Sequence, residues 1–227
     1  MCSSDLDYGN LGTMFQSLGN YKKAQGYHEK ALSIRTQIGD RKGEAVVYRN
    51  LGTLFQSLGS YNKAQEYYKK ALAITLEIGD KGGEAADYGK LGTMFQSLGN
   101  YKKAQEHHEK ALSIRKQIGD RAGEAEDYKN LGIVFQSRGN YDKAQDYYKK
   151  ALAIRLEIAH REGEAADDGN LGRLFDLLGE HDKAREHLEK ALRISKEICN
   201  RNGETSCYAN LEAFFCYSKY TLEQINI

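Results

Sequence analysis

The sequence repeats itself every forty residues, and this period limits the fold more than any other property of the chain. The segment LGTMFQSLGNY occupies residues 11–21 and recurs letter for letter at residues 91–101, with near copies at 51–61 and 131–141. A unit of this length cannot bury its apolar face alone, so successive copies have to stack against one another to form a continuous core. The 227 residues therefore predict an array of stacked units.

Each copy has the pattern of two helices joined by a short turn. In the second copy, apolar and small residues recur at the three- and four-residue spacing of a helical stripe, namely Tyr48, Leu51, Gly52 and Phe55 in its first half and Ala64, Tyr68, Ala71 and Leu72 in its second. The first helix is expected over about 44–58 and the second over about 61–78. Gly59 and Gly79 suit the left-handed conformation that ends a helix, and Asp80 is expected to cap the helix that follows.

Small residues recur at fixed positions in every copy. Glycine inside a helix costs about 1 kcal/mol relative to alanine, so a column of such glycines requires a packing reason. We expect each glycine to touch a neighbouring helix. The two columns are Gly12, Gly52, Gly92, Gly132 and Gly172 in the first helices, and Ala24, Ala64, Ala104, Ala144 and Ala184 in the second.

These positions resemble a known signature. The pattern Tyr48-x-x-Leu51-Gly52-x-x-Phe55, followed by Ala64-x-x-x-Tyr68, resembles the tetratricopeptide repeat, and five copies cover nearly the whole chain. The resemblance implies an all-α fold, a right-handed α-solenoid of stacked antiparallel helix pairs whose first helices line the concave side. The forty-residue period and the absence of proline depart from the usual pattern of thirty-four residues. In its period the chain is similar to the arrays of Pins-type G-protein-signalling modulators and of tetratricopeptide repeat protein 28.

The ends and two junctions depart from the repeat. Residues 1–6 are expected to be a non-native or disordered start, residues 7–207 to form five repeats, and residues 208–227 to form a partial sixth repeat or a C-terminal cap. The junctions Ala159-His160 and Cys199-Asn200 lack the glycine that ends the other second helices. We expect these two junctions to be looser.

Charge and composition exclude several classes of function. The 33 basic and 32 acidic residues nearly balance, which argues against a nucleic-acid-binding protein, and no apolar run approaches the length needed to cross a membrane. The four cysteines show no C-x-x-C spacing, so free thiols in a reducing, cytoplasmic compartment are expected. No metal or cofactor site is expected.

No catalytic motif is present, and the chain is not expected to be an enzyme. His28 and His108 occupy the column of Tyr68 and Tyr148, so they are interpreted as substituted packing residues. The tyrosine pairs are interpreted as core packing, and the lysine pairs as part of a solvated, mixed-charge face.

The remaining candidates for function lie on the first helices, away from the apolar stripe. In tetratricopeptide arrays these columns face the groove, where glutamine can bond a peptide backbone and arginine can select acidic partners. The alternative is that they are ordinary solvated residues copied by duplication, since residues 8–45 and 88–125 differ at only five of 38 positions. The candidates are Arg49, Thr53, Gln56, Thr93, Gln96, Lys129, Ile133, Gln136, Arg173 and Asp176.

The sequence therefore predicts a non-catalytic scaffold that binds a protein or peptide in the groove of its first helices. Two alternatives stay open. The array could be the sensor or oligomerisation arm of a larger signalling ATPase or enzyme, or a spacer that self-associates through its exposed ends.

Overall fold

The computed structural model describes residues 3–210 and 212, with side chains from residue 8 onward. Its described residues are helical throughout apart from short turns, and they divide into two compact units, Met1–Gly119 and Asp120–Ile227. The first unit contains α1 (Ser3–Ser17), α2 (Tyr21–Gln37), α3 (Arg41–Ser57), α4 (Tyr61–Glu77), α5 (Lys81–Ser97) and α6 (Tyr101–Ile118). The second contains α7 (Arg121–Ser137), α8 (Tyr141–Glu157), α9 (Arg161–Leu177) and α10 (His181–Glu197), followed by a helix over residues 201–210.

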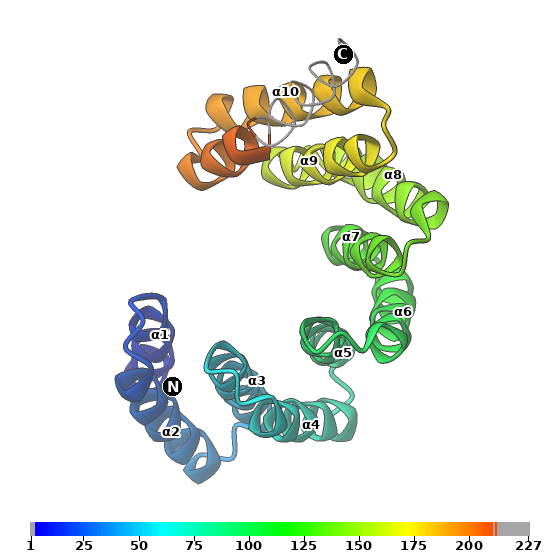
Figure 1. Ribbon diagram of the computed structural model, residues 1–227. Helices are drawn as coiled ribbons and strands as arrows, with labels where there is room; N and C mark the ends of the chain where they lie inside the picture. The colour runs from blue at the N-terminus through cyan, green and yellow to red at the C-terminus, as the bar shows by residue number, and fades with distance from the viewer. Residues whose placement is uncertain (1–2, 211, 213–227) are drawn as a thin grey trace. The chain divides into compact units, whose positions relative to one another are not determined.

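Within each unit the helices pack as antiparallel pairs. The pairs are α1/α2, α3/α4 and α5/α6 in the first unit and α7/α8 and α9/α10 in the second, and each second helix also packs on the first helix of the next pair in its unit. In the first unit α3 also contacts both α1 and α5, so its first helices gather on one side and its second helices on the other (Figure 1). The predicted all-α fold of stacked helix pairs is confirmed in both units.

The turns follow the caps that the sequence predicts. Gly59 and Gly79 have φ of 69° and 70°, and Asp80 accepts a hydrogen bond from the Gly83 amide at 3.1 Å. The first helix of each repeat starts earlier than expected, since α3 begins at Arg41 rather than 44. The reason is that the aspartate is followed directly by the first helical turn, so the charged residues after it lie inside the helix.

The two junctions without glycine keep the same turn. Ala159 and Cys199 adopt φ of 52° and 53°, and both form the hydrogen bonds of the glycine turns. The next caps are also present, because His160 Nδ1 accepts from the Gly163 amide at 2.8 Å and Asn200 accepts from the Gly203 amide at 3.1 Å. The hydrogen bonds of these two junctions therefore show no sign of the looser turn that the sequence predicts. The last helix starts at residue 201, earlier than the expected 208.

At the N-terminal end, α1 already begins at Ser3. Residues 3–6, expected to be part of a non-native or disordered start, therefore lie within a helix, and residues 1–2 are outside the described residues. The assignment of 208–227 to a cap concerns mostly residues that are also outside them.

Each glycine of the interior column lies against an aromatic or leucine side chain of the paired helix. A Cβ on Gly52 would lie 2.5 Å from Tyr68 Cε1, and a Cβ on Gly12 would lie 2.5 Å from His28 Cε1. Tyr68 and His28 are fully buried, as are the alanines of the second column. The packing reason predicted for the glycines, and the packing role predicted for His28 and His108, are confirmed.

A stack of aromatic rings flanked by lysines joins the two helices of most pairs. In α3/α4, the ring of Tyr67 lies 5.3 Å from Phe55 and 6.1 Å from Tyr48, with the ammonium groups of Lys63 and Lys70 over the rings. In α5/α6, His107 takes the central position, 5.3 Å from Phe95 and 5.9 Å from Tyr88.

The α9/α10 pair replaces part of this stack by charge. His187 still stacks on Phe175 at 5.4 Å, but the outer ring is replaced by Asp168, which is fully buried. Asp168 lies 2.8 Å from His187 Nδ1 and 2.9 Å from Lys190 Nζ. An ionic cluster therefore stands where the other pairs have a tyrosine.

Arginine side chains and buried aspartates connect neighbouring pairs. Between α3 and α5, Arg49 Nε donates to Asp87 at 2.6 Å, and Thr75 donates to the same carboxylate at 3.0 Å. Between α8 and α9, Arg155 Nε lies 3.8 Å from Asp167, whose carboxylate has no hydrogen-bond partner among the described residues. The junctions are thus built from related residues with different geometry.

In the part of the chain that the structure describes, no helix has the length and apolar character of a membrane span.

Candidate functional site

Five of the ten predicted groove residues come together in the second unit. They belong to α7 and α9 and line two adjacent hollows of about 320 and 470 Å³. The hollows share Ile133, Arg173 and Asn210, so they form one continuous groove along α7, α9 and the helix over 201–210. We call this surface the second-unit groove. The five predicted residues that line it are Lys129, Ile133, Gln136, Arg173 and Asp176.

The cationic groups of the groove differ in how they are paired. Lys129 Nζ lies 2.6 Å from Glu126, an ion pair one helical turn away on α7. Arg173 donates to the amide oxygen of Asn170, and makes no ion pair with any described residue. Its guanidinium is therefore the cation of the groove that remains available to a carboxylate.

The opposite end of the groove carries an acid and an amide. Asp176 lies 3.4 Å from His181 Nδ1. Gln136 accepts a hydrogen bond from the Tyr148 hydroxyl at 2.7 Å, and burial raises the pKa of that hydroxyl, so it stays a donor. This bond fixes the amide oxygen of Gln136 and leaves its NH₂ group to donate to a partner.

Four of the five predicted residues of the first unit make hydrogen bonds within the repeats, and the fifth, Gln96, has a buried side-chain oxygen without a hydrogen-bond partner among the described residues. Arg49 bonds Asp87 and the carbonyl of Gly83, and Gln56 accepts from the Tyr68 hydroxyl at 2.8 Å. The Thr53 and Thr93 hydroxyls donate to backbone carbonyls one turn earlier, and Gln96 is half-buried. Arg49 lines a hollow of about 270 Å³ between α3 and α5, and the other four predicted residues are not part of its lining.

Sequence reasoning missed part of the groove lining. Asn170 and Asn210 line it, forty residues apart, in the column of Asn50 and Asn130. The recurrence of this asparagine was the signal that could have found them. Gly169 was also missed, because only its neighbours show that space lies beside it.

The groove is lined by amide, charged and apolar side chains. The described residues that line it include no histidine, and burial raises the pKa of its one thiol, Cys207, which keeps that sulfur neutral. Among the described residues, no set of three histidine, cysteine or acidic side chains is arranged to hold a metal.

Several solved structures share this fold. BtubC from P. vanneervenii is 26% identical, with a TM-score of 0.74 over 85% of this chain and 80% of that one. A signal transduction ATPase with a tetratricopeptide repeat sensor, from Pyrococcus horikoshii, is 23% identical, with a TM-score of 0.78 over 91% of this chain and 32% of that one. Aspartyl phosphate phosphatase F from Bacillus subtilis is 18% identical, with a TM-score of 0.80 over 98% of this chain and 62% of that one.

The last two similarities show the fold alone. No curated protein sequence matches the chain. The narrower resemblance to Pins-type modulators and to tetratricopeptide repeat protein 28 stays a prediction.

Family models match most of the sequence. A tetratricopeptide repeat model matches residues 5–77 and 84–157, and a second tetratricopeptide repeat model matches residues 169–203. The first model alone accounts for more than half of the chain, and its matches coincide with the helix pairs described above. The chain belongs to the tetratricopeptide repeat family.

Proposed function

We propose that the chain is a non-catalytic scaffold that binds a partner peptide in the second-unit groove. The observation that carries this proposal is the convergence of Lys129, Ile133, Gln136, Arg173 and Asp176 on two adjoining hollows. The groove combines an apolar wall, amide groups that can donate, and an arginine without a carboxylate partner among the described residues. These are the groups that hold a peptide backbone and select an acidic side chain.

The opposite charges of Arg173 and Asp176 would set the orientation of a bound peptide. Arg173 lies where the two hollows meet, whereas Asp176 lies one turn further along α9 and lines only the larger one. A peptide with an acidic residue near Arg173 and a basic residue near Asp176 matches both charges. A cytoplasmic location and an adaptor role in signalling belong to the same proposal.

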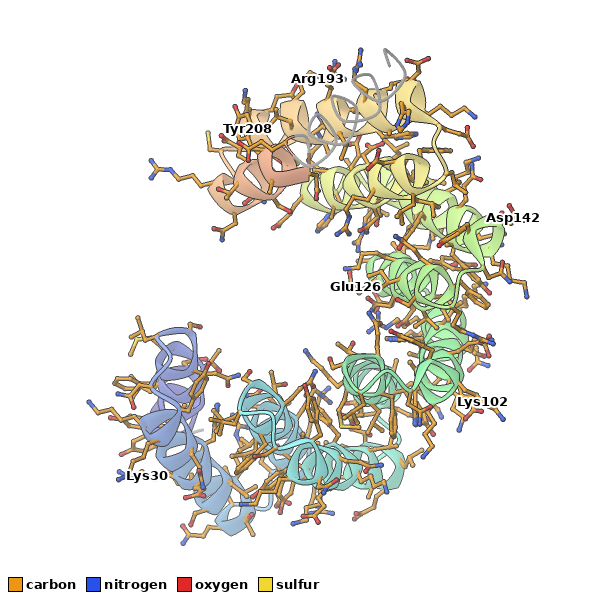
Figure 2. The ribbon with its side chains drawn as sticks, in the orientation of Figure 1. Lys30, Lys102, Glu126, Asp142, Arg193 and Tyr208 are labelled. Atoms are coloured by element: carbon orange, nitrogen blue, oxygen red, sulfur yellow. The ribbon has the colours of Figure 1, made fainter. Side chains whose placement is uncertain are left out.

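The test uses a charge reversal with a matched control in the same unit. Partners captured by the wild-type chain from a lysate are identified by mass spectrometry, and their recovery is measured again with Arg173→Glu. We expect recovery to fall about tenfold or more, because the reversal sets like charges against each other. Arg193→Glu is the control, since Arg193 is exposed on α10 and points away from α9 (Figure 2).

Equal recovery with both variants, each folded by circular dichroism, would show that the groove is not the binding surface. Gln56 and Gln136 are unsuitable targets for this test, because each is bonded to a core tyrosine and its loss would disturb packing.

A second candidate is that the chain acts as the sensor arm of a larger signalling ATPase. The observation that favours it is the similarity to the Pyrococcus horikoshii ATPase, which has a tetratricopeptide repeat sensor and of which this chain spans 32%. Sequencing of the full transcript tests it. A reading frame that continues into a nucleotide-binding domain supports this role, and one that does not removes it.

A further inference from the structure

The inner end of the second-unit groove is a position that an arginine fills elsewhere in the chain. The forty-residue register makes the hollow between α9 and the helix over 201–210 comparable with the hollow between α3 and α5. The smaller hollow of the second unit, about 320 Å³, is lined by Glu162, Ala165, Ala166, Gly169, Ser195 and Gly203 among others. The α3/α5 hollow is lined at the corresponding positions by Lys42, Ala45, Val46, Arg49, Thr75 and Gly83.

At the α3/α5 junction the hollow is about 270 Å³, and Arg49 is part of its lining. The side chain of Arg49 crosses it to donate to Asp87 and to the Gly83 carbonyl, at 2.6 and 3.3 Å. The α3/α5 hollow therefore ends at Arg49 and does not reach Asp87.

Two other junctions are filled by an arginine from the second helix. A Cβ on Gly43 would overlap with Arg35 Nη1, and a Cβ on Gly163 would overlap with Arg155 Nε. Each of these three junctions thus has a long cationic side chain lying across the start of the next first helix.

The junction after α10 has neither arginine. Position 169 is glycine instead of Arg49, and position 195 is serine instead of Arg35 or Arg155. The hollow there reaches Cys207, which stands where Asp87 and Asp167 stand at the earlier junctions. The cation and its buried carboxylate are therefore lost together, and the hollow that the described residues form here has a neutral base.

The surroundings define what fits this space. Its inner wall is made of small side chains and the Cys207 thiol, which behaves as a small apolar group. At the base of the hollow Ser195 and Cys207 face each other at 3.9 Å, so a cation there would meet no carboxylate among the described residues. The carboxylate of Glu162 also lines the hollow, but it is exposed and accepts a hydrogen bond from Asn200 at 3.4 Å. Lys129 and Arg173 also line the hollow, and the arginine has no ion-pair partner among the described residues.

We propose that this hollow is an anchor site for an uncharged, unbranched side chain of a partner peptide, such as methionine, followed or preceded by an acidic residue that meets Arg173. The side chain occupies the place that Arg49 occupies at the α3/α5 junction. The proposal rests on the groove function proposed above and adds the chemistry of the residue that anchors the peptide.

A substitution can fill the site without disturbing the fold. A Cβ on Gly169 would meet no atom within 4 Å, so Gly169→Met places a side chain in the hollow from within the helix. Gly9 is the matched control, because its Cβ also has open space and its junction is already filled by Arg35.

The probe is a phage-displayed library of random seven-residue peptides selected on the complete chain. Enriched peptides are synthesised, and their affinity for the wild type, Gly169→Met and Gly9→Met is measured by fluorescence anisotropy. We expect enrichment of methionine or a similar uncharged side chain beside aspartate or glutamate. Gly169→Met should weaken binding about tenfold to a hundredfold, because the anchor side chain of the peptide can then no longer be buried in the hollow. Gly9→Met should leave the affinity unchanged.

Three results would overturn the anchor site: no enrichment, a basic residue at the invariant position of the enriched peptides, or unchanged affinity for Gly169→Met. The groove itself is assessed separately with Arg173→Glu. Peptides released by Arg173→Glu but not by Gly169→Met leave the groove standing without the anchor, whereas peptides released by neither variant contradict both proposals.

Discussion

Two aspartates in the same column, Asp87 and Asp167, show how much a single junction depends on its partners. Both are fully buried, but Asp87 accepts from Arg49 and Thr75, whereas the carboxylate of Asp167 has no hydrogen-bond partner among the described residues and lies 3.8 Å from Arg155 Nε. Burial raises the pKa of Asp167 to about 7, and the positive charge of Arg155 only partly opposes this rise. The folded chain therefore holds a proton at Asp167 more tightly than the unfolded chain does.

This difference predicts a dependence of stability on pH. A folded pKa above the unfolded value of about 3.9 gives a contribution to stability that is complete below about pH 4 and lost as the pH rises through 7. We expect the free energy of unfolding of Asp167→Asn to change less than that of the wild type between about pH 4 and 7, and to be higher than that of the wild type at pH 8. Urea denaturation followed by circular dichroism measures both.

The control for this variant is Asp87→Asn. Burial also raises the pKa of Asp87, but the hydrogen bonds from Arg49 and Thr75 oppose the rise, so losing the bonded carboxylate should lower stability at neutral pH. If the free energy of unfolding of Asp167→Asn and of the wild type changed in parallel with pH, the raised pKa of Asp167 would be contradicted.

At the scale of residues, the sequence predicted packing better than polar contacts. The glycine and alanine columns needed only helical spacing, because small residues at a fixed period in two paired helices indicate close contact between them. The hydrogen bonds of the glutamines could not be predicted in this way. The bond from the Tyr68 hydroxyl to Gln56 joins two helices, and it depends on the position that the hydroxyl takes in the packed pair. The forty-residue period shows from sequence alone that Gly169 and Cys207 stand where Arg49 and Asp87 stand. Only the structure shows that this replacement borders a hollow.

At the scale of elements, the helix ends are set by caps of different strength. Most second helices end on a glycine with positive φ, but α8 ends on Ala159 with φ of 52°. A residue with a Cβ is destabilised by about 1–2 kcal/mol in this conformation. The turn therefore forms with the same hydrogen bonds at a higher cost.

We expect Ala159→Gly to raise the free energy of unfolding by about 1 kcal/mol, because it removes the strain of the left-handed residue. Chemical denaturation of the complete chain measures the change. The reverse substitution, Gly79→Ala at φ of 70°, should lower stability by a similar amount. If neither substitution moves the midpoint, these turns do not limit stability.

Sequence could predict the existence and type of every helix pair, because the turn residues recur with the period. It could not place the start of α3 at Arg41, since the charged segment after Asp40 carries no apolar stripe. The N-cap, rather than the stripe, decides where such a helix begins.

At the scale of the whole molecule, stability is distributed among junctions between neighbouring pairs. In a repeat array each helix pair contacts only the neighbouring pairs, so a substitution that destabilises one junction should affect mainly the helices beside it. The chain divides into two compact units, residues 1–119 and 120–227. We therefore expect a substitution in one unit to leave the stability of the other unchanged.

Arg49→Ala tests this expectation. It leaves Asp87 buried with Thr75 as its remaining side-chain donor, and breaking a buried ion pair in this way costs about 3–5 kcal/mol. We expect faster amide hydrogen exchange in α3, α4 and α5 and unchanged exchange in α8, α9 and α10, measured by mass spectrometry. Arg193→Ala, at an exposed position, is the control. Equal acceleration in both units would mean that the chain unfolds as one cooperative body.

The aromatic stacks also record an order in which substitutions can accumulate. The three states Tyr48 with Tyr67, Tyr88 with His107, and Asp168 with His187 differ by one residue at each step. Histidine keeps the stack on phenylalanine and also offers a nitrogen to a carboxylate, so it is accepted beside either neighbour. An aspartate that arrived before the histidine would be buried against a tyrosine ring. In duplicated repeats of this kind, a histidine in the second helix thus opens a mutational route from an aromatic contact to an ionic one.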